Sequence, residues 1–219
     1  MTPSEILRYA EEREEVCAYG REMEERGLTI LTSGNVSRRV EEGCLITPSN
    51  TPYPGIKPAD VLLMDLDGSV LEGEGNPSVE HKVHLACYRF RDDVQGVIHS
   101  HPQVATAFAA ARVPLPSFLD EFGVFVGEEV RVADYAMSGT PDIAENVVKA
   151  LGEDSNAVFL ASHGLVTVGR SLFDAMRVAR MVERAAGTYL WTQVLGGAAE
   201  LPEEARAFFR QAFQMFRTG

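Results

Sequence analysis

The sequence predicts one α/β domain in which helices pack around a central mixed, largely antiparallel sheet. The chain is 219 residues long, which fits a single domain over residues 1–219 with one buried core. Apolar stretches with helical spacing alternate along it with short apolar strands. Several strands are joined by hairpin turns, which make neighbouring strands antiparallel. A Rossmann-type parallel sheet is therefore not expected.

A helix is expected first. Thr2 is placed to cap it, Pro3 fits its first position, and Gly27 ends it. The apolar residues expected on one side of this helix are Ile6, Leu7, Ala10, Cys17 and Met23.

Two hairpins are expected next. Strands 36–40 and 44–47 flank the turn Glu42-Gly43. Strands 61–66 and 69–71 flank the turn Asp67-Gly68.

The rest of the chain alternates between helices and strands. After Asn76-Pro77 a helix is expected over residues 78–91, with Val79 and Val83 on its apolar face. The strand 94–100 ends in histidines. The remaining predicted elements are helix 103–111, strand 130–135, helix 140–152, strands 157–161 and 165–168, a helix from Ser171 to about residue 196, and helix 203–216.

Charge and cysteine content narrow the class of protein. The net charge of −12 makes a broad surface for nucleic acid or an anionic membrane unexpected. Cys17, Cys44 and Cys87 are an odd number without C-x-x-C spacing, which favours a reducing cytoplasm over a disulfide framework. Residues 2–20 are charged throughout, so they predict neither a signal peptide nor a membrane span.

Three histidines have the spacing of a metal site. His99 and His101 lie two apart at the end of an apolar strand, so both imidazoles point to one face. His163 precedes Gly164 at a junction between two apolar strands. Three imidazoles with an open fourth position are the usual ligands of catalytic zinc. Spacing alone leaves a structural role for these histidines open.

Glu80 is the candidate acid/base residue. It falls in the first turn of the helix expected from Ser78, where an anion is stabilised. Complementing the helix dipole is its alternative role. Glu80 and His84 are four apart and form a rival ligand pair. A role in the structure, or in supporting the ligands from behind, is favoured for His81 and His84, because they point about 60° apart around the helix.

Three small polar turns are suited to binding an anion. They cover residues 32–35, 47–50 and 76–78, and each offers hydroxyls and loop amides. Taken singly, each also fits an ordinary turn.

Five motifs in order resemble class II aldolases of the fuculose-phosphate aldolase and adducin type. They are Thr-Ser-Gly-Asn-Val-Ser at 32–37, Ile-Thr-Pro-Ser at 46–49, Pro-Ser-Val-Glu at 77–80, His-Ser-His at 99–101 and Ser-His-Gly at 162–164. The resemblance covers nearly the whole chain. It implies a three-layer α/β/α fold and a homotetramer with active sites between neighbouring subunits.

The resemblance also implies a zinc-dependent aldehyde-lyase of carbohydrate metabolism. One Zn²⁺ per subunit, with Mn²⁺ or Co²⁺ as alternatives, is implied on His99, His101, His163 and Glu80, and Glu80 is implied as the catalyst. The implied reaction is retro-aldol cleavage of a small ketose 1-phosphate, most like L-fuculose 1-phosphate, to dihydroxyacetone phosphate and an aldehyde. The residues implied in substrate binding are Thr32, Gly34, Asn35, Ser49, Asn50, Ser78 and Val79.

The chain also departs from the family pattern. Val79 stands where fuculose aldolases carry a second serine, Asn50 where a glycine is common, and Phe216 where a tyrosine assists the aldehyde half. Asp120 and Glu121 lie in a region expected to be a loop, where either a second acid/base or a solvated acidic surface fits. The alternative functions are a ribulose-5-phosphate 4-epimerase-like or methylthioribulose-1-phosphate dehydratase-like enzyme, and a non-catalytic adducin-like interaction module.

Overall fold

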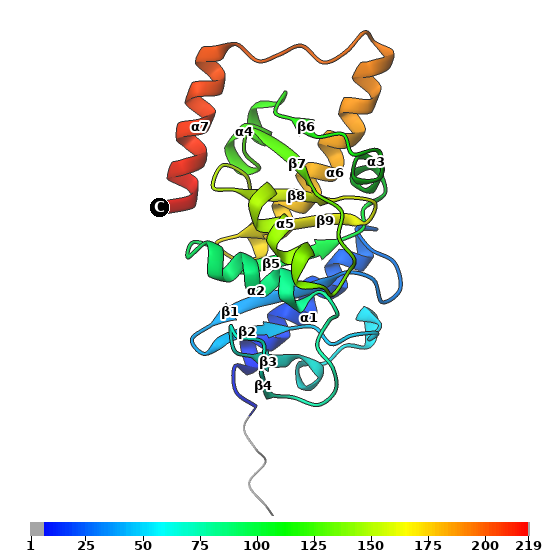
Figure 1. Ribbon diagram of the computed structural model, residues 1–219, viewed down its shortest axis with the longest axis vertical. Helices are drawn as coiled ribbons and strands as arrows, with labels where there is room; N and C mark the ends of the chain where they lie inside the picture. The colour runs from blue at the N-terminus through cyan, green and yellow to red at the C-terminus, as the bar shows by residue number, and fades with distance from the viewer. Residues whose placement is uncertain (1–6, 219) are drawn as a thin grey trace, which may run out of the picture.

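The computed structural model describes residues 7–218, and within them a nine-stranded sheet forms the centre of the molecule (Figure 1). The strands are β1 (Asn35–Val40), β2 (Gly43–Ile46), β3 (Leu62–Met64), β4 (Val70–Glu72), β5 (Gly96–Ser100), β6 (Leu115–Pro116), β7 (Glu129–Ala133), β8 (Ala157–Leu160) and β9 (Gly164–Gly169). Their order is β4-β3-β2-β1-β5-β9-β8-β7-β6. Among these pairs only β7 and β8 run parallel. The sheet is therefore mixed and largely antiparallel, as predicted.

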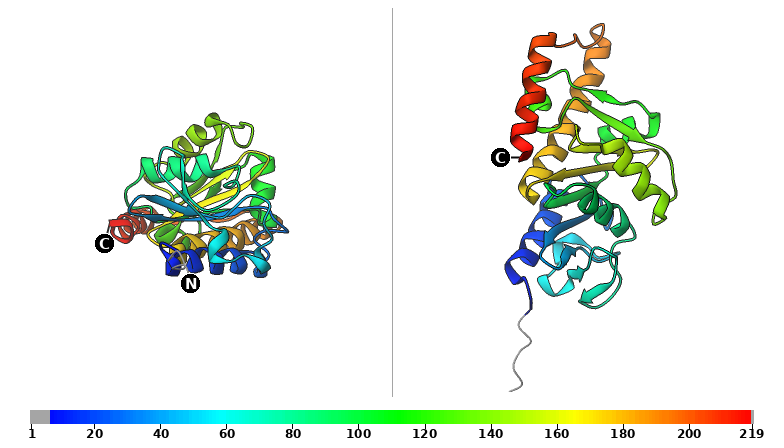
Figure 2. Two further views of the ribbon diagram at one scale, coloured as in Figure 1. Left: turned by 90° about the horizontal axis from the view of Figure 1, so that it is seen from below. Right: turned by 60° about the vertical axis from the view of Figure 1, so that its left-hand side comes forward.

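Helices cover both faces of the sheet, which gives the three-layer α/β/α arrangement (Figure 2). The helices are α1 (Ala10–Glu25), α2 (His81–Phe90), α3 (Gln103–Ala111), α4 (Asp120–Phe125), α5 (Pro141–Leu151), α6 (Leu172–Val194) and α7 (Glu203–Thr218), with 3-10 turns at Tyr53–Gly55 and Pro58–Asp60. Buried side chains of α1, α3, α4 and α6 form one apolar layer against the sheet. Those of α2 and α5 form the other. The histidine-bearing strand β5 lies between these layers.

Turn and cap chemistry placed most element boundaries correctly. The first hairpin pairs Val40 with Gly43, and the second pairs Met64 with Val70. Helix α3 covers the predicted residues. Thr140 and Ser171 precede α5 and α6 as predicted, and Gly152 ends α5.

The first helix begins later than predicted. Thr2, Pro3 and Ile6 lie outside the described residues, while Leu7 precedes the helix, which starts at Ala10. Tyr9 has a left-handed backbone, with φ of 58°. The fully buried Arg13 donates from Nε to the carbonyl of Arg8 at 2.7 Å and from a guanidinium N–H to Glu72 at 2.7 Å. The Arg13 side chain thus takes up the carbonyl oxygen of Arg8, the residue two positions before the helix begins.

Two further predictions, one at the start of α2 and one around Asp120, were wrong. Helix α2 begins at His81 rather than Ser78, because the Ser78 amide bonds to the carbonyl of Thr47 and Glu80 becomes the N-cap. Val79 is consequently 57% exposed instead of packing on an apolar face. The segment expected as a loop around Asp120 is the short helix α4, which is held in place by the buried Phe122.

None of the helices in residues 7–218 combines the length and the apolar character that crossing a bilayer requires.

The cap of α6 provides a direct test of this fold. Ser171 Oγ accepts a hydrogen bond from the Asp174 amide at 3.1 Å. We expect Ser171→Ala to lower the free energy of unfolding by about 1 kcal/mol, because an N-terminal amide of the helix loses its partner. Ser171→Asn keeps a capping oxygen and serves as the control, with a smaller loss. Urea unfolding measures both, and an Ala variant as stable as the wild type would contradict the cap.

Candidate metal centre

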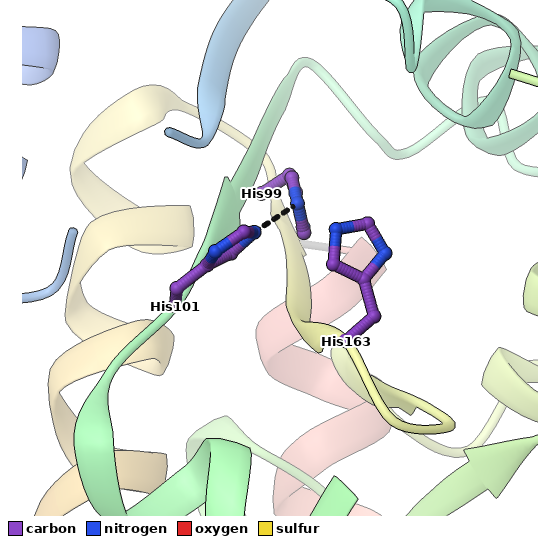
Figure 3. Close-up of side chains that lie close together, drawn as sticks. All are labelled: His99, His101 and His163. Atoms are coloured by element: carbon purple, nitrogen blue, oxygen red, sulfur yellow. Dashed lines mark hydrogen bonds between the residues drawn. The ribbon is translucent and has the colours of Figure 1, made fainter. Parts of the chain in front are cut away.

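The three predicted histidines converge at one point. His99 is in β5, His101 directly follows that strand, and His163 is in the turn between β8 and β9 (Figure 3). Their candidate ligand nitrogens all lie within 4.8 Å of one another. The ring centroids are 4.7 to 4.9 Å apart. The cluster therefore has the dimensions to hold one metal ion.

Antiparallel pairing of β5 and β9 brings the histidines together. His99 lies opposite Val166, and Ser100 lies opposite Leu165. The β8–β9 turn is tight, since the His163 amide bonds to the carbonyl of Leu160 at 3.0 Å and Ser162 takes a φ of 59°. This turn points His163 back over the end of β5.

Gly164 leaves room for the histidine rings. A Cβ at this position would lie 2.6 Å from the Ser100 carbonyl oxygen, 2.8 Å from His101 Cδ2 and 3.3 Å from His99 Cε1. The close approach of β9 to both histidines therefore requires glycine here.

Hydrogen bonding and burial prepare the imidazoles for an ion. His99 Nδ1 donates to the carbonyl of Leu165 at 3.0 Å, so Nε2 is the ring nitrogen that faces the cluster. Burial lowers the pKa of His101 to about 3, with the His99 and His163 rings adding to the effect. Burial and the neighbouring His99 also lower the pKa of His163. At neutral pH these two rings are uncharged and can donate lone pairs to an ion.

The Glu80 carboxylate completes the cluster. Its Oε2 lies 3.1 Å from His99 Nε2, and its Oε1 lies 3.0 Å from His163 Nε2. Burial alone would raise the pKa of Glu80, but His99, His163 and a hydrogen bond from Asn35 outweigh it and hold the pKa below its usual value. Three imidazoles around a buried carboxylate match the donors that a divalent transition metal prefers.

Two neighbours of Glu80 complete its surroundings. Asn35 Nδ2 donates to Glu80 Oε2 at 2.9 Å, so the side chain predicted to bind substrate is bonded to the carboxylate. Ser138 Oγ lies 3.4 Å from both Glu80 Oε1 and His163 Nδ1. Sequence reasoning missed Ser138, which lies in the loop after β7 and belongs to no motif. The bond from Lys82 Nζ to the Gly139 carbonyl, 2.8 Å, holds that loop against α2.

His84 and His81 lie outside the histidine cluster. His84 is fully buried, with Nε2 bonded to Asn35 and Nδ1 bonded to Ser37. Both nitrogens are occupied, so Glu80 and His84 do not form a rival ligand pair. His81 Nδ1 lies 2.8 Å from the carbonyl of Ser78.

Two of the three polar turns are joined by backbone hydrogen bonds. The Ser49 amide donates to Asn76 at 3.0 Å, and the Ser78 amide donates to Thr47 at 3.3 Å. In the third turn, Gly34 directly precedes β1 and has a φ of 76°. It lies so close to the His99 carbonyl that a Cβ here would be 2.6 Å from that oxygen. Of the predicted substrate-binding residues, Thr32 and Ser49 are half-buried, Asn50 and Val79 are exposed, and Ser78 is buried.

Three further candidates lie away from the histidines within this chain. Asp120 and Glu121 line a cavity of about 440 Å³ with Met181 and Arg184 of α6. Phe216 packs edge-on against Phe125, with the ring centroids 5.1 Å apart.

Known proteins resemble this chain over most of its length. Residues 14–190 match the class II aldolase and adducin N-terminal domain. A 5-deoxy-D-ribulose 1-phosphate aldolase of Bacillus thuringiensis serovar kurstaki is 37% identical, over 93% of this chain and 95% of the relative. An L-fuculose phosphate aldolase of Escherichia coli O6:H1 is 35% identical, over 78% and 79%. A solved L-fuculose 1-phosphate aldolase structure superposes with a TM-score of 0.90 at 35% identity, covering 96% of this chain and all of the other.

Gly164 offers a test of how the cluster is built. We expect Gly164→Ala to lower the free energy of unfolding by about 1–3 kcal/mol, because the new methyl group overlaps backbone and both histidine rings. A crystal structure of the variant should show His101 displaced. Gly187→Ala in α6 is the matched control, since its Cβ would meet nothing within 4 Å, and it should stabilise the protein slightly. Equal stability of the two variants would contradict the close packing at Gly164.

Proposed function

Since the chain belongs to the class II aldolase and adducin family, we propose that it is a zinc-dependent aldolase that cleaves a small ketose 1-phosphate to dihydroxyacetone phosphate and an aldehyde. Its relatives include aldolases named for 5-deoxy-D-ribulose 1-phosphate and for L-fuculose phosphate. The sugar is therefore proposed as a class, with L-fuculose 1-phosphate and 5-deoxyribulose 1-phosphate as its first two members to test.

One observation carries this proposal: a buried carboxylate lies within 3.1 Å of two members of a three-histidine cluster. An interaction module has no use for that arrangement, because burying a carboxylate costs free energy unless a cation or strong hydrogen bonds compensate. A lyase acting next to a carbonyl uses both the ion and the carboxylate.

In the proposed resting enzyme, His99, His101, His163 and Glu80 hold the zinc. When bound, zinc supplies a Lewis acid that offsets the negative charge developing on substrate oxygens beside the carbonyl. The tautomer of His99 is preset by the Leu165 carbonyl, so this ligand needs no rearrangement.

The proton chemistry is assigned to Glu80. Cleavage breaks the bond between carbons 3 and 4 of the ketose, and the electron pair stays on carbon 3 as an enediolate. The hydroxyl on carbon 4 loses its proton as the aldehyde forms. The ionised Glu80 takes up one proton and delivers it to carbon 3, while the hydroxyl on carbon 4 releases one, so the overall reaction consumes none. Its lowered pKa leaves Glu80 as a carboxylate between turnovers.

The phosphate is proposed to bind where the polar turns meet. Thr32, Ser49 and Ser78 offer hydroxyls, while Gly34, Asn50 and Val79 offer backbone amides. Val79 lacks a hydroxyl but is exposed just ahead of the N-terminus of α2, where an anion is favoured.

We further propose a cytoplasmic homotetramer with active sites between subunits. Segments that flank the site expose large apolar side chains, with Ile30 68%, Leu31 75% and Met137 70% exposed. A neighbouring subunit would cover them. The three free, buried cysteines suit a reducing compartment.

The metal is the first part to test. We expect the purified protein to contain about one zinc per chain by mass spectrometry, and the His99→Ala/His101→Ala double variant to contain none. His81→Ala removes a neighbouring imidazole outside the cluster and should retain the metal. If the wild type takes up no zinc on reconstitution, the zinc proposal fails and an interaction module replaces it.

The reaction is tested by the products. With L-fuculose 1-phosphate or 5-deoxyribulose 1-phosphate, the zinc form should release dihydroxyacetone phosphate in a coupled assay. Glu80→Gln should lower kcat by about 10²–10⁴-fold, because the amide cannot carry the proton. The surface change Glu204→Gln is the matched control and should leave kcat unchanged. An epimerised sugar, or loss of water without carbon–carbon cleavage, would replace the aldolase assignment with the epimerase or dehydratase.

A further inference from the structure

A line of buried hydrogen bonds leads away from Glu80 into the protein. Asn35 Nδ2 lies 2.9 Å from Glu80 Oε2, and Asn35 Oδ1 lies 2.5 Å from His84 Nε2. His84 Nδ1 lies 2.6 Å from Ser37 Oγ, which lies 2.7 Å from the Tyr88 hydroxyl. All five residues are buried, and none is more than 9% exposed.

The line is built from two rows of residues that alternate. Asn35 and Ser37 come from one face of β1, and Glu80, His84 and Tyr88 come from one face of α2 and its N-cap. Two residues of strand advance about 6.8 Å, and four residues of helix advance about 6 Å. These steps nearly match, so each strand side chain can lie between two helix side chains.

The hydrogen bonds can run in one direction only. The ionised Glu80 accepts but cannot donate, so Asn35 must present its NH₂ group to it. Asn35 Oδ1 then needs a donor, which makes His84 the tautomer protonated on Nε2. Burial lowers the pKa of His84 to about 3, so its ring is neutral and Nδ1 accepts from the Ser37 hydroxyl. Ser37 in turn accepts from Tyr88.

We propose that Asn35, His84, Ser37 and Tyr88 are positioning residues that hold the Glu80 carboxylate in one orientation toward the histidine cluster. The inference rests on the proposed function for the role of Glu80. It assigns the Asn35 amide to the carboxylate, because its Nδ2 donates to Glu80 while its Oδ1 is held by His84.

The line does not serve as a proton exit. It ends at Tyr88, which is fully buried and lies under the guanidinium of Arg39, with 5.0 Å from Arg39 Cζ to the ring centroid. A chain closed to water can orient a carboxylate but cannot exchange its protons with solvent. Orientation is therefore its function.

The tautomer of His84 is the first measurement. We expect long-range ¹H–¹⁵N correlation spectra of the histidine-labelled zinc protein to show His84 protonated on Nε2 and bare on Nδ1. The His84→Gln variant assigns the signal by its disappearance. A His84 ring protonated on Nδ1 would overturn the proposed direction of the hydrogen bonds from Tyr88 to Glu80.

Kinetics and zinc affinity separate positioning from mere stability. We expect His84→Leu to lower kcat about 10–100-fold and to weaken zinc affinity in a chelator competition, with KM changed less than threefold. His84→Gln should recover part of the loss, because its amide can still donate to Asn35. Tyr88→Phe removes a single hydroxyl at the far end, keeps the fold, and should show a smaller fall in kcat with an unchanged KM.

Thr167→Val is the matched control for a lost buried hydrogen bond. Thr167 is fully buried in β9 and donates to the Ala175 carbonyl at 3.0 Å, outside the line. The Thr167→Val variant should lose thermal stability, while its kcat and zinc affinity stay at the wild-type values.

Two kinetic outcomes would overturn the inference. One is a His84→Leu variant with wild-type kcat and zinc affinity despite lower stability. The other is a raised KM at unchanged kcat, which would return Asn35 to substrate binding. If the wild type cleaves no ketose 1-phosphate, the proposed function fails, and the tautomer together with the zinc affinities still decides the positioning role.

Discussion

The antiparallel pairing of β5 with β1 on one side and β9 on the other is the constraint on which the site depends. This pairing places His99 between Asn35 of β1 on one side and Val166 of β9 on the other. The tight turn ahead of β9 then returns His163 to the same place. Groups from three distant parts of the sequence meet because a single central strand ends there. Both helical layers pack on this strand's neighbours, so the core and the site share one frame.

Two glycines let the backbone approach closely enough for the site to form. Gly34 passes against the carbonyl of His99, and Gly164 passes against both His99 and His101. The result is a compact group of three imidazoles around one buried carboxylate. Nitrogen and oxygen donors gathered in this way suit a divalent cation. The folded chain thus presents the donor set of a metal site before any substrate is considered.

The sequence predicted the parts of this structure that depend on local rules. The two hairpins, the span of α3, the cap of α6 and the same-face pair His99 and His101 follow from turn chemistry and from the two-residue period of strands. It did not predict features that depend on contacts between distant segments. The bond from the Ser78 amide to the Thr47 carbonyl moved the start of α2. Arg13 of α1 bonds to the carbonyl of Arg8, which precedes the helix, and to the distant Glu72. Ser138 enters the site only because Lys82 holds its loop. The family resemblance named Asn35, but only the fold shows which way its amide points.

The matched steps of β1 and α2 have a consequence for how such chains can change over time. Asn35 and Ser37 form the pattern Asn-x-Ser, and Glu80, His84 and Tyr88 form Glu-x₃-His-x₃-Tyr. Each of the three inner residues both donates and accepts a hydrogen bond, and the two end residues make one each within the series. A substitution at one position therefore leaves its neighbours with an unpaired donor or acceptor. The five positions are therefore expected to be inherited as a block, retained together where the carboxylate is used and lost together where it is not. Within this family, the presence of both patterns in one sequence would then distinguish members that use the carboxylate in catalysis from members that have kept only the fold.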